Sequence, residues 1–330
     1  EAEQSLSVSE VVPAIRMMAS QGDDIKTLRV VNNPLVEWFA QDEEHFAKVA
    51  KPFSPDSIIY CRSKYIYIAA ATKEEVLSQA EQKIADYISQ NGYAPKVIVV
   101  KGLGLITIGE NAKDCANTED VYLDMMKVSY LAQSFGGEHQ MTAEQIHFVD
   151  NWEAHRPNFK SAYPGRVENK IFIITGAAQG FGEGIARNLM QQGANIVVAD
   201  LNEVVGQQTA DNFNKAAGSN RAIFVKTNVS DLESLGNLIR QTIINFGALD
   251  AFVSNAGVLR AGGLEAMTPD ERFEFWRNEL SKCIRCNACR NVCPACSCIK
   301  CVFDNPNTGI SAKASADDFE EMLDLVPRVD

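Results

Sequence analysis

Seven of the nine cysteines of this 330-residue chain lie close together near its carboxyl-terminal end. They are Cys283, Cys286, Cys289, Cys293, Cys296, Cys298 and Cys301. The first four follow the spacing C-x-x-C-x-x-C-x-x-x-C-P, which lets short loops wrap thiolates around a [4Fe–4S] cluster. A zinc knot is an alternative, and a disulfide framework is disfavoured in a cytosolic setting. The remaining cysteines could complete this site, hold a second metal or have no ligand role.

A glycine-rich turn is the second pattern that could do chemistry. It reads TGAAQGFG over residues 175–182 and follows the apolar run KIFIIT. Glycines let a backbone turn sharply and approach a pyrophosphate, while the N-terminus of the next helix stabilises the anion. Strand, turn and helix in this order favour a dinucleotide site over an ordinary tight turn.

Asp200 closes the next apolar run, IVVAD. A carboxylate there can bind the adenosine ribose hydroxyls and would repel a 2′-phosphate, which favours NAD over NADP. A helix cap in the sequence Asp-Leu-Asn is the alternative role for this residue.

These motifs, together with Asn-Val at 228–229 and Asn-Ala-Gly at 255–257, resemble the short-chain dehydrogenase/reductase family over about residues 170–275. The resemblance implies an NAD(H)-binding oxidoreductase, and the aldolase-like resemblance of the first 155 residues, given below, implies that the parent acts on a sugar or a sugar-derived alcohol. It assigns cofactor binding to Gly176, Gln179, Gly180, Phe181, Gly182, Asp200, Leu201, Asn228, Val229, Asn255, Ala256 and Gly257.

The family's proton-transfer residues are missing from the expected place. Members use a Tyr-x-x-x-Lys pair and a Ser well beyond Asn-Ala-Gly, in which the Lys lowers the pKa of the Tyr. No tyrosine occurs in residues 258–330, so we expect impaired hydride transfer and assign no catalytic residue. Tyr60 and Lys64 also spell Tyr-x-x-x-Lys, but they precede the glycine turn in strand-like sequence and are interpreted as a coincidence.

The elements that must position this site alternate regularly. Strands are predicted at 170–175, 194–199, 222–225 and 250–254, and helices at 180–192, 203–216 and 232–245. Apolar strands separated by helices predict a doubly wound parallel sheet, a partial Rossmann sheet. Thr-Pro-Asp at 268–270 predicts one further helix start, after which the alternation stops.

The first 155 residues predict a separate α/β unit. Helices are expected at 73–91 and around Val121–Ala132, and β-rich runs are SIIY, YIYIAA, VIVV and LITI. The stretches PFSPDSIIYCRSKYIYI, PKVIVVKGLGLITIG and FVDNWEAHR resemble the class II aldolase-like part of fused aldolase/short-chain dehydrogenases. Such aldolases use a metal held by histidines, two of them in a His-x-His pair.

This chain offers His45, His139, His147 and His155 without a His-x-His pair, and Lys101 stands where a ligand is expected. The four histidines are therefore interpreted as surface or linker residues, and metal-dependent aldol activity is not expected.

Residues 276–304 resemble the ferredoxin-like iron–sulfur subunits of hydrogenase and formate dehydrogenase complexes. This resemblance implies an alternative function, electron transfer through a [4Fe–4S] cluster to a redox partner protein. The predicted organisation is an aldolase-like segment (1–155), a linker (156–169), a partial dehydrogenase domain (170–275), an iron–sulfur segment (276–304) and an acidic tail (305–330). Because two family patterns break off, we interpret the chain as a chimera.

Composition sets the outer bounds. The length predicts about two domains, and 46% hydrophobic residues are typical of a globular protein. The net charge of −12 disfavours nucleic acid and anionic lipid as partners. No apolar run approaches the roughly 18 residues of a membrane span, and no signal peptide is recognised, so a cytoplasmic protein is expected. The oligomeric state is not predicted.

Overall fold

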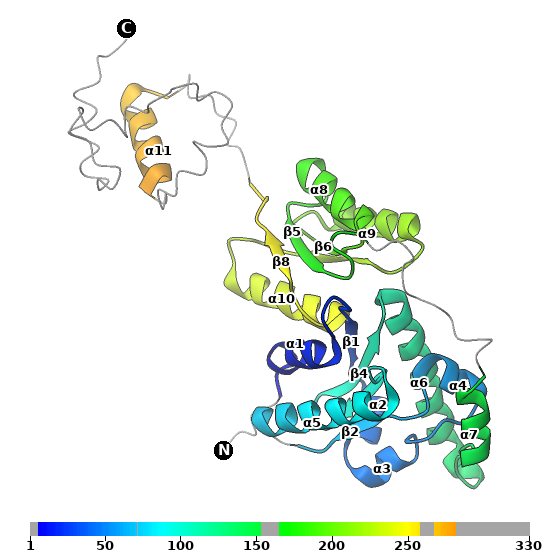
Figure 1. Ribbon diagram of the computed structural model, residues 1–330. Helices are drawn as coiled ribbons and strands as arrows, with labels where there is room; N and C mark the ends of the chain where they lie inside the picture. Colours follow the sequence, from blue (N-terminus) through cyan, green and yellow to red (C-terminus); the bar gives the residue numbers. More distant parts are fainter. Residues whose placement is uncertain (1–5, 71, 153–164, 258–266, 282–330) are drawn as a thin grey trace. The chain divides into compact units, whose positions relative to one another are not determined.

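The computed structural model describes residues 6–70, 72–152, 165–257 and 267–281. Contacts divide the chain into two compact units, Glu1–Gly257 and Val258–Asp330. Figure 1 shows the described helices and strands of both units as ribbons. The cysteine segment, residues 283–301, lies outside the described residues, as do the acidic tail and most of the expected linker.

The first unit contains two four-stranded sheets. In sheet order, the strands of the first are β1 (Thr27–Val31), β4 (Gly104–Gly109), β3 (Val97–Val100) and β2 (Ile66–Ile68). The β1–β4 and β4–β3 pairs are antiparallel, whereas β2 runs parallel to β3. The predicted runs YIYIAA, VIVV and LITI are therefore confirmed as strands.

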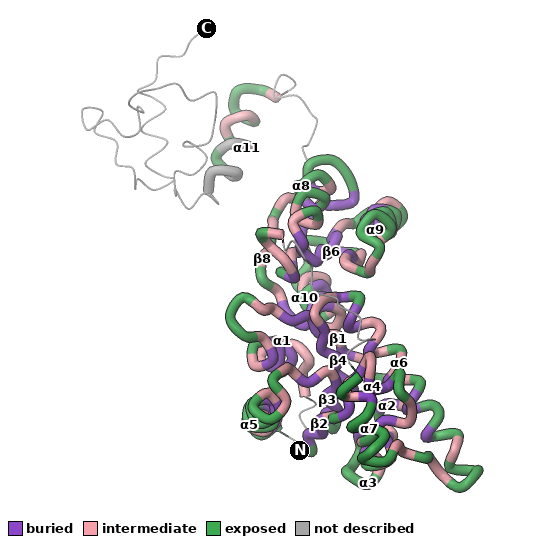
Figure 2. The backbone as a smooth tube through the Cα atoms, turned by 45° about the vertical axis from the view of Figure 1, so that its right-hand side comes forward, coloured by how far each residue is buried: buried purple, intermediate pink, exposed green. Residues whose placement is uncertain are grey.

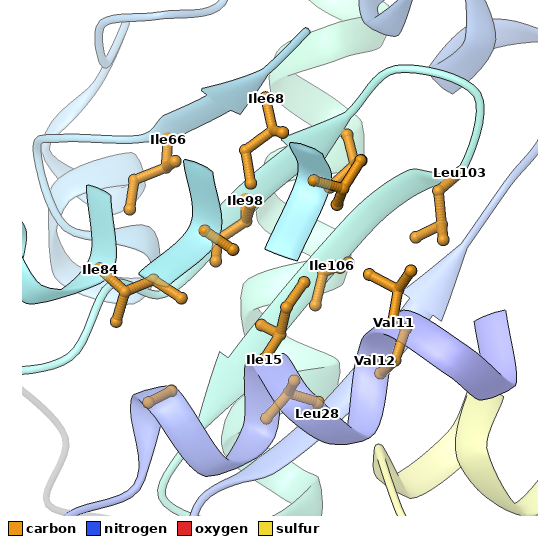
Figure 3. Packing of buried hydrophobic residues seen from close by; sticks show 14 of the residues in the cluster. Val11, Val12, Ile15, Leu28, Ile66, Ile68, Ile84, Ile98, Leu103 and Ile106 are labelled. Carbon is orange, nitrogen blue, oxygen red and sulfur yellow. The ribbon is translucent and has the colours of Figure 1, made fainter. Parts of the chain in front are cut away.

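Helices cover both faces of this first sheet. On one face lie α1 (Val8–Ala19) and α5 (Lys73–Asn91), the latter a confirmed prediction. Figure 3 shows Ile15 of α1 and Ile84 of α5 directed toward Ile98 and Ile106 of the strands. All four side chains are buried, and burial of each contributes about 1.5–3 kcal/mol.

The opposite face packs against the remaining helices of this part. They are α2 (Pro34–Ala40), α3 (Glu43–Ala47), α4 (Pro55–Cys61) and α6 (Ala112–Ala132). The 3₁₀ helix η1 (Gln133–Phe135) and α7 (Ala143–Asp150) follow. The predicted second helix is confirmed and begins further upstream, at Ala112, where Asn111 accepts a hydrogen bond from the Asp114 amide at 3.0 Å.

The strand predicted for SIIY is wrong, because these residues form α4. Ser54 Oγ accepts from Ser57 N at 3.3 Å while Ser54 N donates to Ser57 Oγ at 3.0 Å, a reciprocal capping box that starts the helix. Tyr60 therefore lies on a helix, which ends at Cys61, so Lys64 does not follow it on the same helix.

The second sheet is fully parallel, with the strand order β7-β6-β5-β8. Its strands are β5 (Ile171–Thr175), β6 (Asn195–Asp200), β7 (Ala222–Lys226) and β8 (Ala251–Val253). α8 (Gly180–Gln191) and α9 (Glu203–Ala217) pack on one face, and α10 (Leu232–Phe246) packs on the other. This arrangement confirms the predicted Rossmann-like α/β fold.

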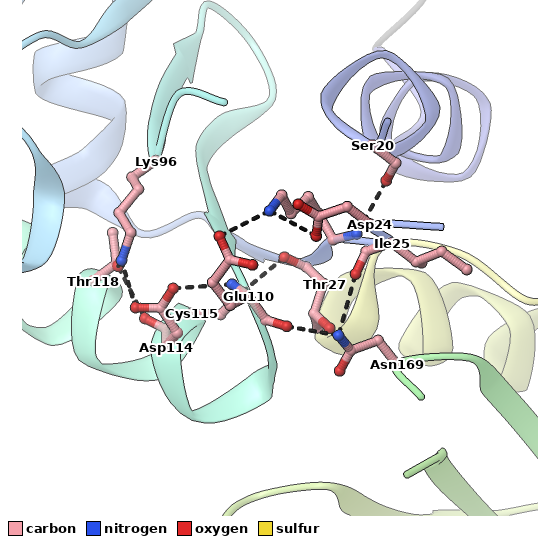
Figure 4. A network of polar contacts seen from close by, with 11 residues as sticks. Ser20, Asp24, Ile25, Thr27, Lys96, Glu110, Asp114, Cys115, Thr118 and Asn169 are labelled. Carbon is pink, nitrogen blue, oxygen red and sulfur yellow. Dashed lines mark hydrogen bonds and ion pairs between the residues drawn. The ribbon is translucent and has the colours of Figure 1, made fainter. Parts of the chain in front are cut away.

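α10 is shared between the two sheets. Its Phe246 belongs to the core of the second sheet, whereas its Ile243 packs with the core of the first. Polar contacts join the same region, since Asn169 Nδ2 donates to Ile25 O at 3.2 Å and to Glu110 O at 2.6 Å (Figure 4). Figure 2 shows buried residues following the strands and exposed ones along the outer side of α9.

In the second unit, α11 (Pro269–Ser281) confirms the helix start predicted at Thr-Pro-Asp. Thr268 Oγ1 accepts from Glu271 N at 3.3 Å, and Thr268 N donates to Glu271 Oε2 at 2.8 Å. This pair is another capping box. Within the described part of the chain, no helix has the length and apolar character needed to cross a membrane.

Candidate functional site

The carboxyl ends of the second sheet's strands bring the predicted residues together. The chain passes from β5 to β6 and β7 on one side, then returns through α10 to β8 on the other side of β5. β5 therefore has β6 on one side and β8 on the other, and such a switch point in a parallel sheet is where ligands commonly bind, at the carboxyl ends of the strands. The glycine turn, Asp200, Asn228 and Asn255 all follow these strand ends.

The three glycines of the turn have different structural roles. A Cβ on Gly176, whose φ is +64°, would lie 2.9 Å from the Cα of Ala256. A Cβ on Gly182 would lie 2.2 Å from the carbonyl oxygen of Gly176. Gly180 has a φ of +66° and open space around it, so its backbone is accessible from outside.

Asn255 fastens the end of β8 to this turn. Its Nδ2 donates to Thr175 O at 2.9 Å, and its backbone N donates to Thr175 Oγ1 at 3.0 Å. The Ala256 amide donates to the same hydroxyl at 3.0 Å. Asn255 and Ala256 therefore shape the turn, and Gly257 follows at the surface.

The N-terminus of α8 lies at the same end of the sheet, within the glycine turn. Gln179 is the N-cap residue, and its side chain accepts no backbone hydrogen bond. The first amides of a helix have no intrahelical partner, and with the helix dipole they favour an anion. Phe181, in the first turn, is 90% exposed, so its ring is available to a ligand.

Asp200 faces the turn from the end of β6. Its Oδ2 accepts from Ala178 N at 3.0 Å, and its Oδ1 accepts from Asn202 N at 3.0 Å. Each oxygen keeps a free lone pair for a further donor. The alternative role as a helix cap is not observed, because Asn202 caps α9 by accepting from Val205 N at 3.2 Å.

Leu201, Asn228 and Val229 complete the rim. Leu201 and Val229 are exposed apolar residues. Asn228 is held by its own loop and by α10, since its Oδ1 accepts from Ser230 N at 3.0 Å and its backbone N donates to Ser234 Oγ of α10 at 2.9 Å.

Two supporting hydroxyls were not predicted from the sequence. Thr175 Oγ1 accepts from the backbone amides of Asn255 and Ala256. A hydroxyl residue at the last position of β5 was a sequence signal that could have indicated this role. Thr209 of α9 donates to Ala178 O at 2.7 Å, and nothing in the sequence indicated this contact.

The histidines do not form a metal centre within the described chain. His45 lies 2.7 Å from Asp42, whose pKa is lowered by hydrogen bonds from the backbone and side chain of His45. His139 and His147 are exposed, and His155 lies outside the described residues. Among the side chains that the structure describes, no group of three or more His, Cys, Asp or Glu residues could hold a metal ion.

The fold and the site define a Rossmann-like α/β protein with a glycine turn at the switch point. Comparison with known families identifies the segment: residues 170–288 match the short chain dehydrogenase family. The match runs past the expected end at residue 275 into the cysteine run.

Two curated relatives illustrate the similarity. Trans-4-hydroxycyclohexanecarboxylate dehydrogenase of Sinomonas cyclohexanicum is 38% identical over 119 residues, covering 35% of this chain and 44% of that protein. The uncharacterized oxidoreductase YuxG of Bacillus subtilis is 28% identical over 166 residues, covering 50% of this chain and 24% of that protein. The chain thus spans less than half the length of these relatives.

Among solved structures, sorbitol-6-phosphate 2-dehydrogenase SrlD from Erwinia amylovora is 30% identical with a TM-score of 0.28, covering 32% of this chain and 41% of that one. Residues 170–288 are therefore similar to the short-chain dehydrogenase/reductase family, whose members typically bind NAD(P). The aldolase-like and ferredoxin-like resemblances are not supported by these comparisons.

Proposed function

We propose that the second sheet binds NAD(H) in the crevice at the carboxyl ends of β5 and β8, as part of a short-chain dehydrogenase-type oxidoreductase. The pyrophosphate lies over Gly180 and the uncapped N-terminus of α8. The adenosine half lies between Asp200 with Leu201 and the loop of Asn228 and Val229. The open backbone at Gly180 supports this placement, because apart from its chain neighbours and its own helix no atom lies within 4 Å of the position a Cβ would take.

Asp200 carries the choice of cofactor. Its carboxylate is fixed by two backbone amides, so it cannot swing away from an incoming ribose without losing both hydrogen bonds. A fixed anion accepts hydrogen bonds from ribose hydroxyls and repels a 2′-phosphate. NAD(H) is therefore the preferred dinucleotide.

Bound NAD(H) would supply the hydride acceptor or donor. The residues of this chain bind and orient the cofactor, but residues 258–330 contain no tyrosine to move the substrate proton. We therefore expect impaired hydride transfer. The parent substrate, a sugar or sugar-derived alcohol, is proposed only from the aldolase-like resemblance of the first 155 residues.

The test is a titration of the full chain with NADH and NADPH, followed by nicotinamide fluorescence or calorimetry. Wild-type protein should prefer NADH. Asp200→Asn should weaken NADH binding about tenfold or more, since hydrogen bonds to a charged group contribute about 1.5–3 kcal/mol. The same change should reduce discrimination against NADPH.

Asp211→Asn is the matched control, because Asp211 is exposed on α9 and accepts from Gln207 Nε2 of the same helix at 2.9 Å. It should leave both affinities unchanged. Absence of NADH binding, or equal effects of the two substitutions, would show that the nucleotide site is misassigned.

The cysteine spacing favours a second candidate, an iron–sulfur electron carrier in which Cys283, Cys286, Cys289 and Cys293 include the ligands. Anaerobic reconstitution with iron and sulfide should then give a coloured protein with an EPR signal after reduction. A colourless protein that retains zinc would refute this candidate.

A further inference from the structure

The segments at the carboxyl ends of the second sheet's strands hold a single cation. These segments are residues 176–183, 200–204, 226–232 and 255–257. Lys226 is their one Lys or Arg residue, whereas four of their residues are acidic: Glu183, Asp200, Glu203 and Asp231. Proteins bind phosphate groups mainly with Arg and Lys side chains. Lys226 is therefore the one side chain of these segments whose charge suits the 2′-phosphate that distinguishes NADPH from NADH.

Lys226 lies beside Asp200. The two residues pair in register at the ends of the parallel strands β7 and β6, and neighbouring strands are about 4.8 Å apart. Val198 and Phe224, two residues earlier on each strand, both pack in the core beneath α8 and α9. Because side chains alternate along a strand, Asp200 and Lys226 point to this same face of the sheet.

The first turn of α9 lies over the end of β7. A Cβ on Gly206 would overlap the ring of Phe224, so the helix and the strand meet closely there. Glu203 is three residues before Gly206 and shares its helix face. Glu203 therefore reaches the last residue of β7, and its Oε2 lies 3.1 Å from Lys226 Nζ. The single ammonium group of these segments is thus paired with a carboxylate.

This ion pair differs from Asp200 in how firmly it is held. Asp200 is fixed by two backbone amides, whereas the side chains of Lys226 and Glu203 are 63% and 66% exposed. An exposed ion pair contributes little free energy, so loss of one partner leaves the other available for a new contact. Removal of the Glu203 charge would leave an ammonium group beside the position proposed for the adenosine ribose.

We propose that Glu203 is a second determinant of cofactor choice and acts through Lys226. It neutralises the ammonium group that would otherwise attract a 2′-phosphate, and it adds a negative charge near Asp200. NADH has no 2′-phosphate, so the pair affects NADPH alone. This inference rests on the proposed nucleotide site and extends it from one specificity residue to three.

The test is titration of the full chain with NADH and NADPH at low ionic strength, where exposed charges are least screened. Glu203→Gln should strengthen NADPH binding about fivefold, the weight of one exposed ion pair, and change NADH affinity less than about twofold. Glu203→Gln combined with Lys226→Met should return NADPH affinity to the wild-type value. This double variant has the net charge of the wild type and lacks only the ammonium group.

Asp211→Asn is the charge control, because it removes an exposed carboxylate from the same helix, about two turns beyond Glu203. It should not change NADPH affinity. No gain with Glu203→Gln, a gain that persists without Lys226, or an equal gain with Asp211→Asn would overturn the proposal and leave the NADH site standing. Failure of the wild-type chain to bind NADH would instead refute the nucleotide site, and this inference with it.

Discussion

Arg16 joins three separate segments of the first unit, and its replacement is the most direct test of how the two sheets are held together. The residue lies on α1, with only 7% of its side chain exposed. Its Nε donates to Lys26 O at 2.8 Å, and its Nη2 donates to Asn169 O at 3.1 Å. Nη1 and Nη2 also donate to the two carboxylate oxygens of Asp250, each at 3.1 Å.

Asp250 connects Arg16 to the second sheet by hydrogen bonds to β5. Its Oδ2 accepts from Ile171 N at 2.8 Å, and its backbone N donates to Ile171 O at 3.0 Å. Asp250, the residue before β8, thus holds the first residue of β5, and Arg16 attaches Asp250 to α1. Arg16→Met keeps the apolar stem and removes all four hydrogen bonds.

The expected loss in unfolding free energy is about 3 kcal/mol, the lower end of the range for breaking a buried ion pair. The lower end applies because the Asp250 side chain is 28% exposed and water can still reach it. Urea unfolding of the full chain, followed by circular dichroism, measures this loss. Asp250→Asn in the Arg16→Met background should add little, since the partner is already gone.

Arg187→Met is the control, because Arg187 is largely exposed and pairs with Glu183 one helical turn away. It should cost at most about 0.5 kcal/mol. A loss below about 1 kcal/mol for Arg16→Met, or additive effects of the two changes at Arg16 and Asp250, would refute the reasoning.

Three further predictions concern the turn, the buried thiols and the core. Gly182→Ala should abolish NADH binding, because the new Cβ would lie 2.2 Å from a backbone oxygen. Gly184→Ala, in open space on the same helix, should stabilise the chain by about 0.5–1 kcal/mol. Nucleotide titration and urea unfolding check both, and retained NADH binding by Gly182→Ala would contradict the geometry. Desolvation by burial raises the pKa of the Cys61 and Cys115 thiols. Above about pH 8.5 the unfolded chain therefore releases protons that the folded chain keeps. The unfolding free energy should then fall by up to about 1.4 kcal/mol per pH unit for each thiol. Thermal unfolding from pH 7 to pH 10, with the double Ala variant showing a flatter decline, tests this, and parallel declines would argue against it. Ile106→Ala should cost about 2–5 kcal/mol, because Ile106 is fully buried in the first core, and a smaller loss in urea unfolding would show that the core collapses around the cavity.

Local patterns predicted most elements because their signals are contained in a few neighbouring residues. The helix at 73–91 has apolar residues at helical spacing and ends at a left-handed Gly92, and the four parallel strands are continuous apolar runs. SIIY was misread because β-branched residues favoured a strand while the capping box of Ser54 and Ser57 decided for a helix.

The sequence by itself determined the glycine turn, the acidic residue that ends β6 and the order of strands and helices in the second sheet, because each depends on residue type and local spacing. It could not determine that Asn255 bonds Thr175, or that Arg16 reaches Asp250, because these partners lie 80 and 234 residues apart. Contacts of this kind depend on how the chain packs in three dimensions, and a single sequence carries no local signal for them.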